Sequence, residues 1–182
     1  MIYEPREDSF LLQKVVRREV KTGDKVIDIG TGSGIQAVTA LEKTGDVTAA
    51  DVNPECIKKL KENQPWIKAI ESDLFENISE KFDIIIFNPP YLPRDKREPK
   101  DSVLATTGGL QGNEIITEFL KQAKKHLEKD GKILLAYSSL SGDIPSISRF
   151  LGYTLEIISK QSFDFETIYA AVLKSRIISG SF

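Results

Sequence analysis

The feature that most limits the fold of this chain is the regular alternation of short apolar runs with segments whose apolar residues recur at helical spacing. The short runs have the length and residue types of strands. Strands that alternate with helices run parallel, because each helix carries the chain back to the same end of the sheet. The alternation therefore predicts a parallel sheet that is covered by helices on both faces.

The predicted elements follow one another in a regular order. Helices are expected at 8–20, 35–45, 54–64, 113–131 and 143–151, and strands at 24–30, 46–54, 66–73, 82–87, 132–138, 154–160 and 165–174. Asp8 or Ser9 is the expected N-cap of the first helix, whereas Gly45 and Gly131 are expected to end two others. The last two strands have no helix between them, which predicts an antiparallel hairpin at one edge. The predicted fold class is α/β, with a Rossmann-like, mainly parallel sheet of seven strands.

Composition excludes several classes of protein. The 25 basic and 27 acidic side chains give a net charge of −2, so the chain lacks a basic field and nucleic acid is not expected as a partner. One cysteine and one histidine allow neither an internal disulfide nor a His/Cys metal cage, so no metal is expected. No apolar run approaches the roughly 20 residues that span a bilayer, and the acidic start "MIYEPREDSFLLQ" is unlike a signal peptide. These features predict a cytoplasmic protein.

A glycine-rich turn follows the first predicted strand. The stretch "DIGTGSG" contains Asp28, Gly30, Gly32 and Gly34. Glycines let the backbone turn sharply and approach a ligand with its amides. In parallel sheets a ligand binds beyond the carboxyl ends of the strands, where the strand order reverses. We therefore predict that this turn, including Thr31, binds a cofactor.

Acidic residues also follow the second and third strands. Asp51, beside Val52, can accept hydrogen bonds from two ribose hydroxyls, and Asp73 can accept from an adenine amino group while Leu74 offers a backbone donor. Acids at three strand ends suit a cation better than a diphosphate. Ile35 stands where a dinucleotide site has its last glycine. The pattern predicts S-adenosylmethionine, which carries a sulfonium and an ammonium group.

The fourth predicted strand, "FDIIIF", is apolar enough to be buried on both faces, and it ends in "NPPY". In such a fold it adjoins the first strand, so its end faces the cofactor. The Asn88 side-chain oxygen and the Pro89 carbonyl can accept hydrogen bonds from both N–H groups of a planar nitrogen and so direct its lone pair. The prolines stiffen the turn, and Tyr91 offers a flat face to the acceptor group. We predict that Asn88, Pro89 and Tyr91 are catalytic and that they bind the substrate together with Pro90.

The motifs "DIGTGSG" and "NPPY", with "GGLQGNE" at 108–114, resemble those of the HemK/PrmC-type glutamine methyltransferases, which modify the GGQ glutamine of translation release factors. The opening "YEPREDSFLL" at 3–12 resembles their archaeal and eukaryotic branch. The resemblance covers roughly residues 2–140 and, more loosely, the final hairpin. It implies the class I methyltransferase fold and an S-adenosylmethionine-dependent enzyme that methylates the glutamine side-chain amide of a class I release factor.

The resemblance also implies roles for single residues. Ser9 would close over the cofactor from the amino-terminal segment. Asp28 and Gly30 would contact the methionine end of the cofactor, and Asn88 would bridge the cofactor and the substrate amide. The segment 108–114 would shape the substrate mouth.

The expected organisation is a single methyltransferase domain over 1–182. We expect a cofactor-covering segment and helix at 1–22, a cofactor-binding core at 23–140, and a C-terminal helix and hairpin at 141–182. The mixed-charge loop at 92–102 is expected to be a solvated segment or, alternatively, a lid over the substrate.

The resemblance implies a protein partner as well. Members of the short branch work with a small zinc-binding activator protein. No amino-terminal helical domain is expected before the fold, in contrast to the bacterial members, so recognition of the release factor is expected to differ. The third strand, which contains "WIKAI", is a predicted sheet edge, and exposed edges accept an added strand. We predict that the partner pairs along 66–70.

The residues leave other interpretations open. A nucleic-acid amino methyltransferase faces the same planar nitrogen, and a lysine is a further possible acceptor. A cofactor-binding regulatory subunit would need no catalysis. A separate interpretation is that the acids at the strand ends, Asp28, Asp51 and Asp73, only cap the turns or helices that follow them.

Overall fold

The computed structural model describes residues 4–92 and 107–176. The helices are α1 (Glu7–Glu19), α2 (Ile35–Leu41), α3 (Pro54–Asn63), α5 (Glu114–Ala123) and α6 (Ile144–Phe150). The strands are β1 (Val26–Ile29), β2 (Val47–Asp51), β3 (Lys68–Glu71), β4 (Phe82–Phe87), β5 (Leu127–Ser138), β6 (Tyr153–Ser162) and β7 (Thr167–Ser175). The loop predicted at 92–102 lies outside the described residues, apart from Leu92.

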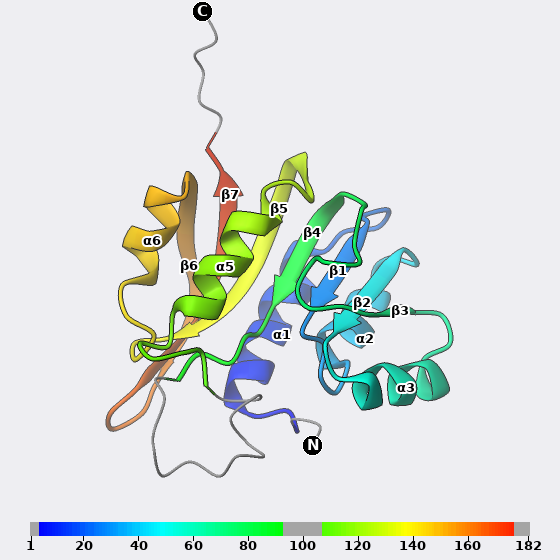
Figure 1. Cartoon of the computed structure of the whole chain (residues 1–182), viewed down its shortest axis with the longest axis horizontal. Helices are drawn as coiled ribbons and strands as arrows, with labels where there is room; N and C mark the ends of the chain where they lie inside the picture. Colours follow the sequence, from blue (N-terminus) through cyan, green and yellow to red (C-terminus); the bar gives the residue numbers. More distant parts are fainter. Residues whose placement is uncertain (1–3, 93–106, 177–182) are drawn as a thin grey trace, which may run out of the picture.

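The strands form one sheet in the order β3-β2-β1-β4-β5-β7-β6 (Figure 1). β1 pairs in parallel with β2 and β4, β2 with β3, and β4 with β5, whereas β7 runs antiparallel to both β5 and β6. The predicted seven-stranded, mainly parallel sheet with an edge hairpin is therefore confirmed. The strand order reverses between β1 and β4, so the carboxyl ends of these two strands flank the place where ligands bind in such sheets.

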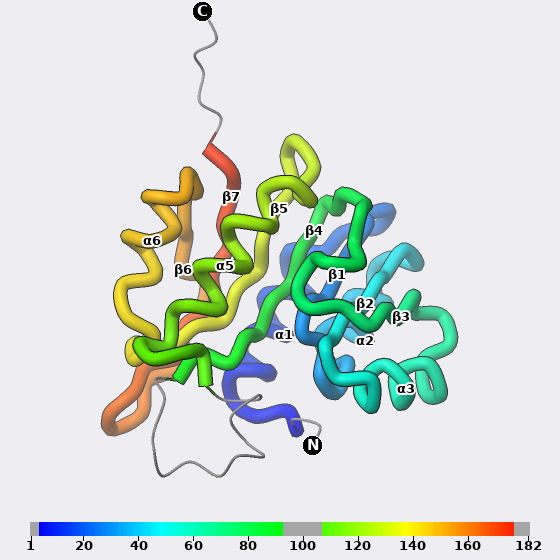
Figure 2. The backbone as a smooth tube through the Cα atoms, viewed as in Figure 1, coloured from blue at the N-terminus to red at the C-terminus, as the bar shows by residue number. Residues whose placement is uncertain are grey.

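Apolar side chains cover both faces of the sheet. In β4, Ile85 and Phe87 join a buried cluster with residues of α5 and α6, while Ile84 and Ile86 join a second cluster with residues of α1 and α2. Figure 2 follows the chain from one layer to the other. Because side chains of a strand alternate between its faces, a strand between two helical layers is apolar at nearly every position, as "FDIIIF" is. Within 4–92 and 107–176, no helix has the length and apolar content to cross a membrane.

The helix predicted at 113–131 is too long, because the sheet takes up its last residues. α5 ends at Ala123 and β5 begins at Leu127, which is buried and pairs with Phe82 of β4. A Cβ at Gly131 would lie 3.0 Å from the Phe82 carbonyl oxygen, so Gly131 permits close strand packing and does not end a helix. Tertiary contact with β4 overrides the helical pattern here.

The structure also differs from the prediction at the end of α2 and at the N-cap of α1. α2 ends at Leu41 and not near Gly45, because the buried Thr44 turns inward and donates a hydrogen bond to the Asp24 carbonyl at 2.7 Å. The N-cap of α1 is Arg6, without a side-chain cap, in place of Asp8 or Ser9. These two residues lie buried in the first turn of α1, where they serve other contacts.

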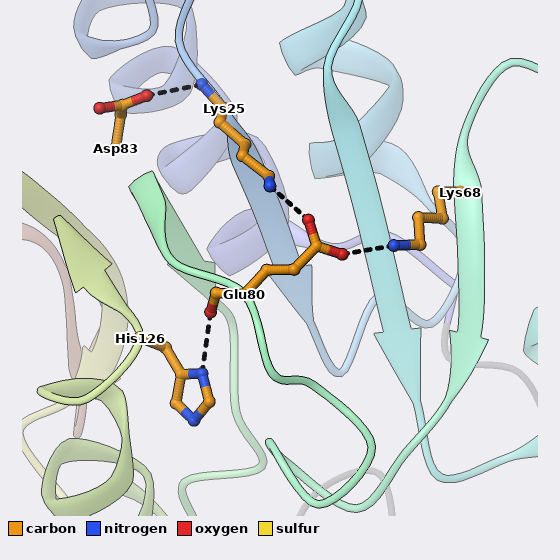
Figure 3. A network of polar contacts seen from close by, with 5 residues as sticks. All are labelled: Lys25, Lys68, Glu80, Asp83 and His126. Atoms are coloured by element: carbon orange, nitrogen blue, oxygen red, sulfur yellow. Dashed lines mark hydrogen bonds and ion pairs between the residues drawn. The ribbon is translucent and has the colours of Figure 1, made fainter.

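A polar network joins the amino ends of the parallel strands (Figure 3). The Glu80 carboxylate accepts hydrogen bonds from Lys25, just before β1, and from Lys68, the first residue of β3. The Glu80 carbonyl lies 2.9 Å from His126 Nδ1, and the Lys25 amide donates to Asp83 at 2.9 Å. The hydrogen bond from Lys25, followed by that from Lys68, lowers the pKa of Glu80 to about 2. The network links the strands at their amino ends, which lie opposite the carboxyl ends where ligands bind in such sheets.

Candidate functional site

A cavity of about 1070 Å³ lies at the carboxyl ends of β1, β2 and β4. Its walls are the turns that follow these strands, the segment after β3, the first turns of α1, α2 and α3, and the side of α5 from Glu114 to Gln122. All predicted site residues except Gly34 line this cavity, namely Ser9, Asp28, Gly30, Thr31, Gly32, Asp51, Val52, Asp73, Leu74, Asn88, Pro89, Pro90 and Tyr91. The fold thus gathers residues from four strand ends and the first helix around one space.

The glycine turn presents its backbone to the cavity. Gly30 and Gly32 have φ angles of 62° and 52°, in the left-handed region that glycine adopts without strain. The Gly32 amide donates to one oxygen of Asp51 at 2.8 Å, and the Asn53 amide donates to the other at 2.8 Å. The Asp51 carboxylate therefore holds the turn after β1 against the turn after β2.

Gly34 lies outside the cavity lining. It is the N-cap of α2 with a φ angle of 83°, and a Cβ there would meet Leu60 Cδ1 at 2.6 Å. Gly34 therefore allows the chain to turn into α2 and to pack closely against Leu60 of α3.

Asp73 lies two residues beyond the end of β3, and its side chain is exposed. Leu74 follows with a φ of 46°, and its carbonyl accepts a hydrogen bond from the Ser72 hydroxyl at 3.1 Å. This bond closes a tight turn that keeps both Asp73 and Leu74 at the wall of the cavity.

Asp28 is a deeply buried acid of the cavity, with 1% of its surface exposed. The Thr31 hydroxyl donates to Oδ2 at 2.6 Å, and the Ala37 amide donates to the same oxygen at 3.2 Å. Burial raises the pKa of Asp28 to about 7, although the two hydrogen bonds lower it, and the charge of Asp51 adds to the increase. A buried acid that titrates near neutrality, in a cavity, indicates a functional site.

We expect Asp28→Asn to stabilise the ligand-free protein, and more so at pH 8 than at pH 5. The folded state holds the Asp28 proton more tightly than the unfolded state does, so ionisation of Asp28 opposes folding. This destabilisation grows as the pH rises from about 4 and is complete above about 7. Each unit of pKa difference corresponds to about 1.4 kcal/mol. Asparagine keeps an oxygen for the bonds from Thr31 and Ala37.

Thermal unfolding of both proteins from pH 5 to pH 8 measures this effect. The difference in Tm should widen toward high pH, by about 2–4 °C for each kcal/mol in a chain of this size. A difference that stays constant with pH would contradict the raised pKa.

The Asn88 side chain is held in one orientation at the end of β4. Its Nδ2 donates to Asp8 Oδ2 at 3.0 Å and to Ser9 Oγ at 3.3 Å. A carboxylate can only accept, so the nitrogen of the Asn88 amide must face Asp8 and its oxygen must point the other way. Within the described part of the chain, this oxygen is buried and has no hydrogen-bond partner. Asn88 therefore offers an oriented and unused acceptor.

Asp8 is a site residue that the sequence analysis missed. It was expected to cap a helix, but it lines the cavity, is 4% exposed and holds Asn88 together with Ser9. Asp8 and Asn88 are separated by 80 residues in the chain. The periodicity of apolar residues depends only on positions close together in the sequence, so it could not reveal this contact. The one available signal was an acid next to a hydroxyl, Asp8 and Ser9, at the start of an apolar helix.

The turn after β4 is fixed from two sides. Ser141 Oγ donates to the Tyr91 carbonyl at 3.1 Å, and the Gly108 amide donates to the Leu92 carbonyl at 2.9 Å. A Cβ at Gly108 would meet the Pro90 carbonyl oxygen at 2.8 Å, so a larger residue would push the two segments apart. These contacts hold the Tyr91 and Leu92 carbonyl groups, at the end of the "NPPY" turn, in defined positions.

The segment 108–114 folds around the Glu114 carboxylate. The Gln111 amide donates to Oε1 at 3.0 Å and the Asn113 amide donates to Oε2 at 3.1 Å. Burial acts to raise the pKa of Glu114, but the backbone hydrogen bonds outweigh it and the pKa is lowered. Glu114 itself lines the cavity, so the end of this segment lies at the cavity wall.

The cavity is lined by acids. Among the described residues that line it are eight carboxylates and no lysine, arginine or histidine: Asp8, Asp28, Asp51, Glu55, Asp73, Glu76, Glu114 and Glu118. The whole chain has a net charge of only −2, so negative charge is concentrated here. Such a wall attracts a cationic ligand and repels phosphate. In the same described residues, no group of His, Cys, Asp and Glu is placed to hold a metal ion.

Comparisons with known proteins agree with this arrangement. The family model of the methyltransferase small domain matches residues 7–166. A protein of Methanocaldococcus jannaschii described as a "putative protein N5-glutamine methyltransferase" is 39% identical over 176 residues, which cover 92% of this chain and 88% of that protein. The release factor glutamine methyltransferase of Streptococcus pneumoniae is 33% identical over 162 residues, 79% of this chain and 56% of that protein. This chain therefore spans little more than half the length of that bacterial relative.

A solved structure shows the same fold. It is a chain of the E. cuniculi Mtq2–Trm112 complex, described as responsible for methylation of the eRF1 translation termination factor. The match has a TM-score of 0.74 and 24% identity, over 96% of this chain and 98% of that chain. At this identity the likeness concerns the fold.

Proposed function

The chain belongs to the methyltransferase small domain family and, within it, to the protein N5-glutamine methyltransferases, and from this premise we propose that it methylates a glutamine side-chain amide in a translation release factor. The observation that carries the proposal is the Asn88 side-chain oxygen, which is buried, oriented by Asp8 and unpartnered among the described residues. Such an oxygen suits the N–H group of a planar amide. The descriptions of the relatives from Methanocaldococcus jannaschii and Streptococcus pneumoniae support the choice of a glutamine in a release factor.

The cavity fits S-adenosylmethionine as the methyl donor, because the acids of its wall match a ligand with two cationic groups. When bound, this cofactor supplies a methyl group that its sulfonium makes electrophilic. We assign the methionine part to Asp28 and Gly30, the ribose to Asp51, and the adenine to Asp73 and Leu74. The proposed cofactor-binding set is completed by Ser9, Thr31, Gly32, Gly34, Val52 and Asn88.

The acceptor side of the site positions an amide nitrogen. Asn88 Oδ1 and the Pro89 carbonyl would accept hydrogen bonds from the two N–H groups of the glutamine amide, and the Tyr91 ring would contact its flat face. Two fixed acceptors turn the nitrogen lone pair toward the methyl group, so the chain contributes orientation and electrostatic stabilisation. The products are the methylated amide, S-adenosylhomocysteine and a proton. A lysine amine would not require two such acceptors.

Asp8→Ala is expected to lower turnover about tenfold, because the Asn88 amide would lose the partner that fixes its orientation. Cofactor affinity should change less than turnover. The measurement is a double-mutant cycle with Asn88→Ala. In the Asn88→Ala background, Asp8→Ala should have almost no further effect on turnover. Two effects that simply multiply would contradict the positioning role of Asp8.

Mass spectrometry of a release factor tests the proposed function. The factor is incubated with this protein, S-adenosylmethionine and a candidate zinc-binding activator, and its peptides are searched for one added methyl group. Modification of the GGQ glutamine, lost when that glutamine is replaced, is the expected result. Methyl transfer to RNA or DNA alone would support the nucleic-acid alternative. Cofactor binding without transfer to any of these acceptors would indicate a regulatory subunit.

We further propose that a small zinc-binding activator pairs with the free edge of β3. Among the described residues β3 pairs only with β2, and Trp66, just before it, is 78% exposed. At the opposite edge, the pairing of β6 with β7 shifts register between Ile157 and Ser159, an irregularity that hinders strand addition. The likeness to a structure solved as an Mtq2–Trm112 complex supports this proposal.

Trp66→Glu is expected to weaken the complex with the activator at least tenfold, because it places a charge in an apolar contact. Isothermal titration calorimetry with the purified activator measures the affinity. Phe150→Glu is the matched control: Phe150 is 90% exposed but ends α6, away from β3, and its replacement should leave the affinity unchanged. Full activity of the chain without any activator would contradict the proposed partnership.

A further inference from the structure

We propose that Gln36 is a further cofactor-binding residue, whose side-chain oxygen accepts a hydrogen bond from the ammonium group of the amino-acid tail of S-adenosylmethionine. This inference rests on the proposed function for its ligand. It adds a residue that lies outside both the glycine motif and the "NPPY" motif.

The Gln36 side chain is buried and held in one orientation. Gln36 is the second residue of α2, is 2% exposed, and its Nε2 donates to the Ser9 carbonyl at 2.9 Å. A carbonyl can only accept, so the Gln36 nitrogen must face Ser9 and its oxygen must face elsewhere. The hydrogen bond to Ser9 therefore fixes which way the Gln36 amide nitrogen and oxygen point.

The Gln36 oxygen is an unused acceptor at the cavity. In the part of the chain that the structure describes, Oε1 is buried and has no hydrogen-bond partner, although the residue lines the cavity. A buried acceptor without a partner is unfavourable and is rare in native proteins. A ligand that donates to it would remove this penalty, so the oxygen indicates a donor group on the bound molecule.

The position of Gln36 selects the amino-acid tail over the nucleoside. Gln36 is tied to Ser9, and Ser9 contacts Asn88 at the end of β4. Asp51 and Asp73, which are assigned to the ribose and the adenine, follow β2 and β3 on the other side of β1. A ligand that spans these strand ends therefore places the group farthest from its adenine near Gln36.

The charge of the surroundings selects the ammonium group of that tail. Asp8 and Asp28 line the same cavity, and Asp28 Oδ2 already accepts from Thr31 and Ala37. An ammonium group carries three N–H donors and is favoured beside carboxylates, whereas a carboxylate of the ligand would be repelled there. Gln36 Oε1 adds a neutral acceptor to this acidic wall.

Calorimetric binding of two ligands tests the inference without any turnover. S-adenosylhomocysteine carries the amino-acid tail, and 5′-methylthioadenosine shares the nucleoside but lacks the tail. Gln36→Met keeps the side-chain length and removes the acceptor, so it should weaken S-adenosylhomocysteine about tenfold and leave 5′-methylthioadenosine unchanged. Equal weakening of both ligands, or of neither, would overturn the inference.

A matched control separates binding from helix packing. Gln13 of α1 also donates an amide hydrogen bond of 2.9 Å, to Thr39 of α2, but it does not line the cavity. Gln13→Met should leave the affinity for both ligands unchanged. If Gln13→Met also weakens S-adenosylhomocysteine and leaves 5′-methylthioadenosine unchanged, the loss of affinity comes from the α1–α2 contact and the inference fails.

A measurement on the unmodified protein covers the case in which Gln36→Met does not fold. The analogue of S-adenosylhomocysteine that lacks only the amino group should bind at least tenfold more weakly than its parent. Equal affinity would show that no protein group accepts from the ammonium, which overturns the inference alone. Failure of the unmodified protein to bind any of these ligands would instead remove the proposed function, and this inference with it.

Discussion

Asn88→Ala is expected to reduce turnover by about 10²–10³-fold, because removal of one oriented polar partner of a reacting group has an effect of this size. The Asn88 oxygen, at the end of β4, has no hydrogen-bond partner among the described residues, and alanine leaves no acceptor in its place. The affinity for S-adenosylmethionine should be largely retained, since most of the proposed cofactor contacts come from β1, β2 and β3. Rates with radiolabelled methyl groups and calorimetric cofactor titrations provide the two measurements.

Asn63→Ala is the control for this experiment. Asn63 is an exposed asparagine at the end of α3, outside the large cavity, and its replacement should change neither quantity. Normal turnover in Asn88→Ala would contradict the proposed mechanism. A loss of cofactor affinity as large as the loss of turnover would assign Asn88 to cofactor binding alone.

Asp51→Ala should weaken cofactor binding by about 1–3 kcal/mol, the usual effect of stranding buried polar partners. The carboxylate, 8% exposed, accepts the amides of Gly32 and Asn53 and keeps lone pairs that can accept ribose hydroxyls. Alanine would remove the ribose contact and also release the glycine turn from β2. Calorimetry with S-adenosylhomocysteine measures the change in affinity.

Asp46→Ala supplies the comparison at the other end of β2. Asp46 is an exposed acid just before the amino end of β2, so its loss removes a carboxylate without touching the cavity. Its affinity for the ligand should equal that of the unmodified protein. Unchanged affinity in Asp51→Ala would refute the ribose assignment and would leave Asp51 a purely structural link between two turns.

The fold could be predicted because its pattern is local. The alternation of strands and helices, and the uninterrupted apolar run of β4, report burial residue by residue. The failures fall where distant contacts decide: Leu127 enters the sheet because it meets Phe82 in β4, and α2 stops early because Thr44 bonds to Asp24. The periodicity of the segment around Leu127 does not reveal the contact with Phe82, and that of the segment around Thr44 does not reveal the bond to Asp24.

The same distinction between local patterns and distant contacts applies to the residues of the site. The glycine turn and the "NPPY" turn follow strands directly, so their meeting at one end of a parallel sheet could be predicted. Asp8 and Gln36 could not, because each acts through a partner 27 or more positions away. Side-chain hydrogen bonds of this kind depend on how α1 docks on the sheet, which no local pattern encodes.

The contact between Asp8 and Asn88 has a consequence for how the protein is made. During translation α1 is synthesised before the sheet that buries it and before the asparagine that it orients. Leu12 and Val16 of α1, which are buried in the folded protein, have no sheet to pack against until then. Competence for methyl transfer should therefore appear late in folding, and fraying of this first helix should abolish it before the sheet itself melts.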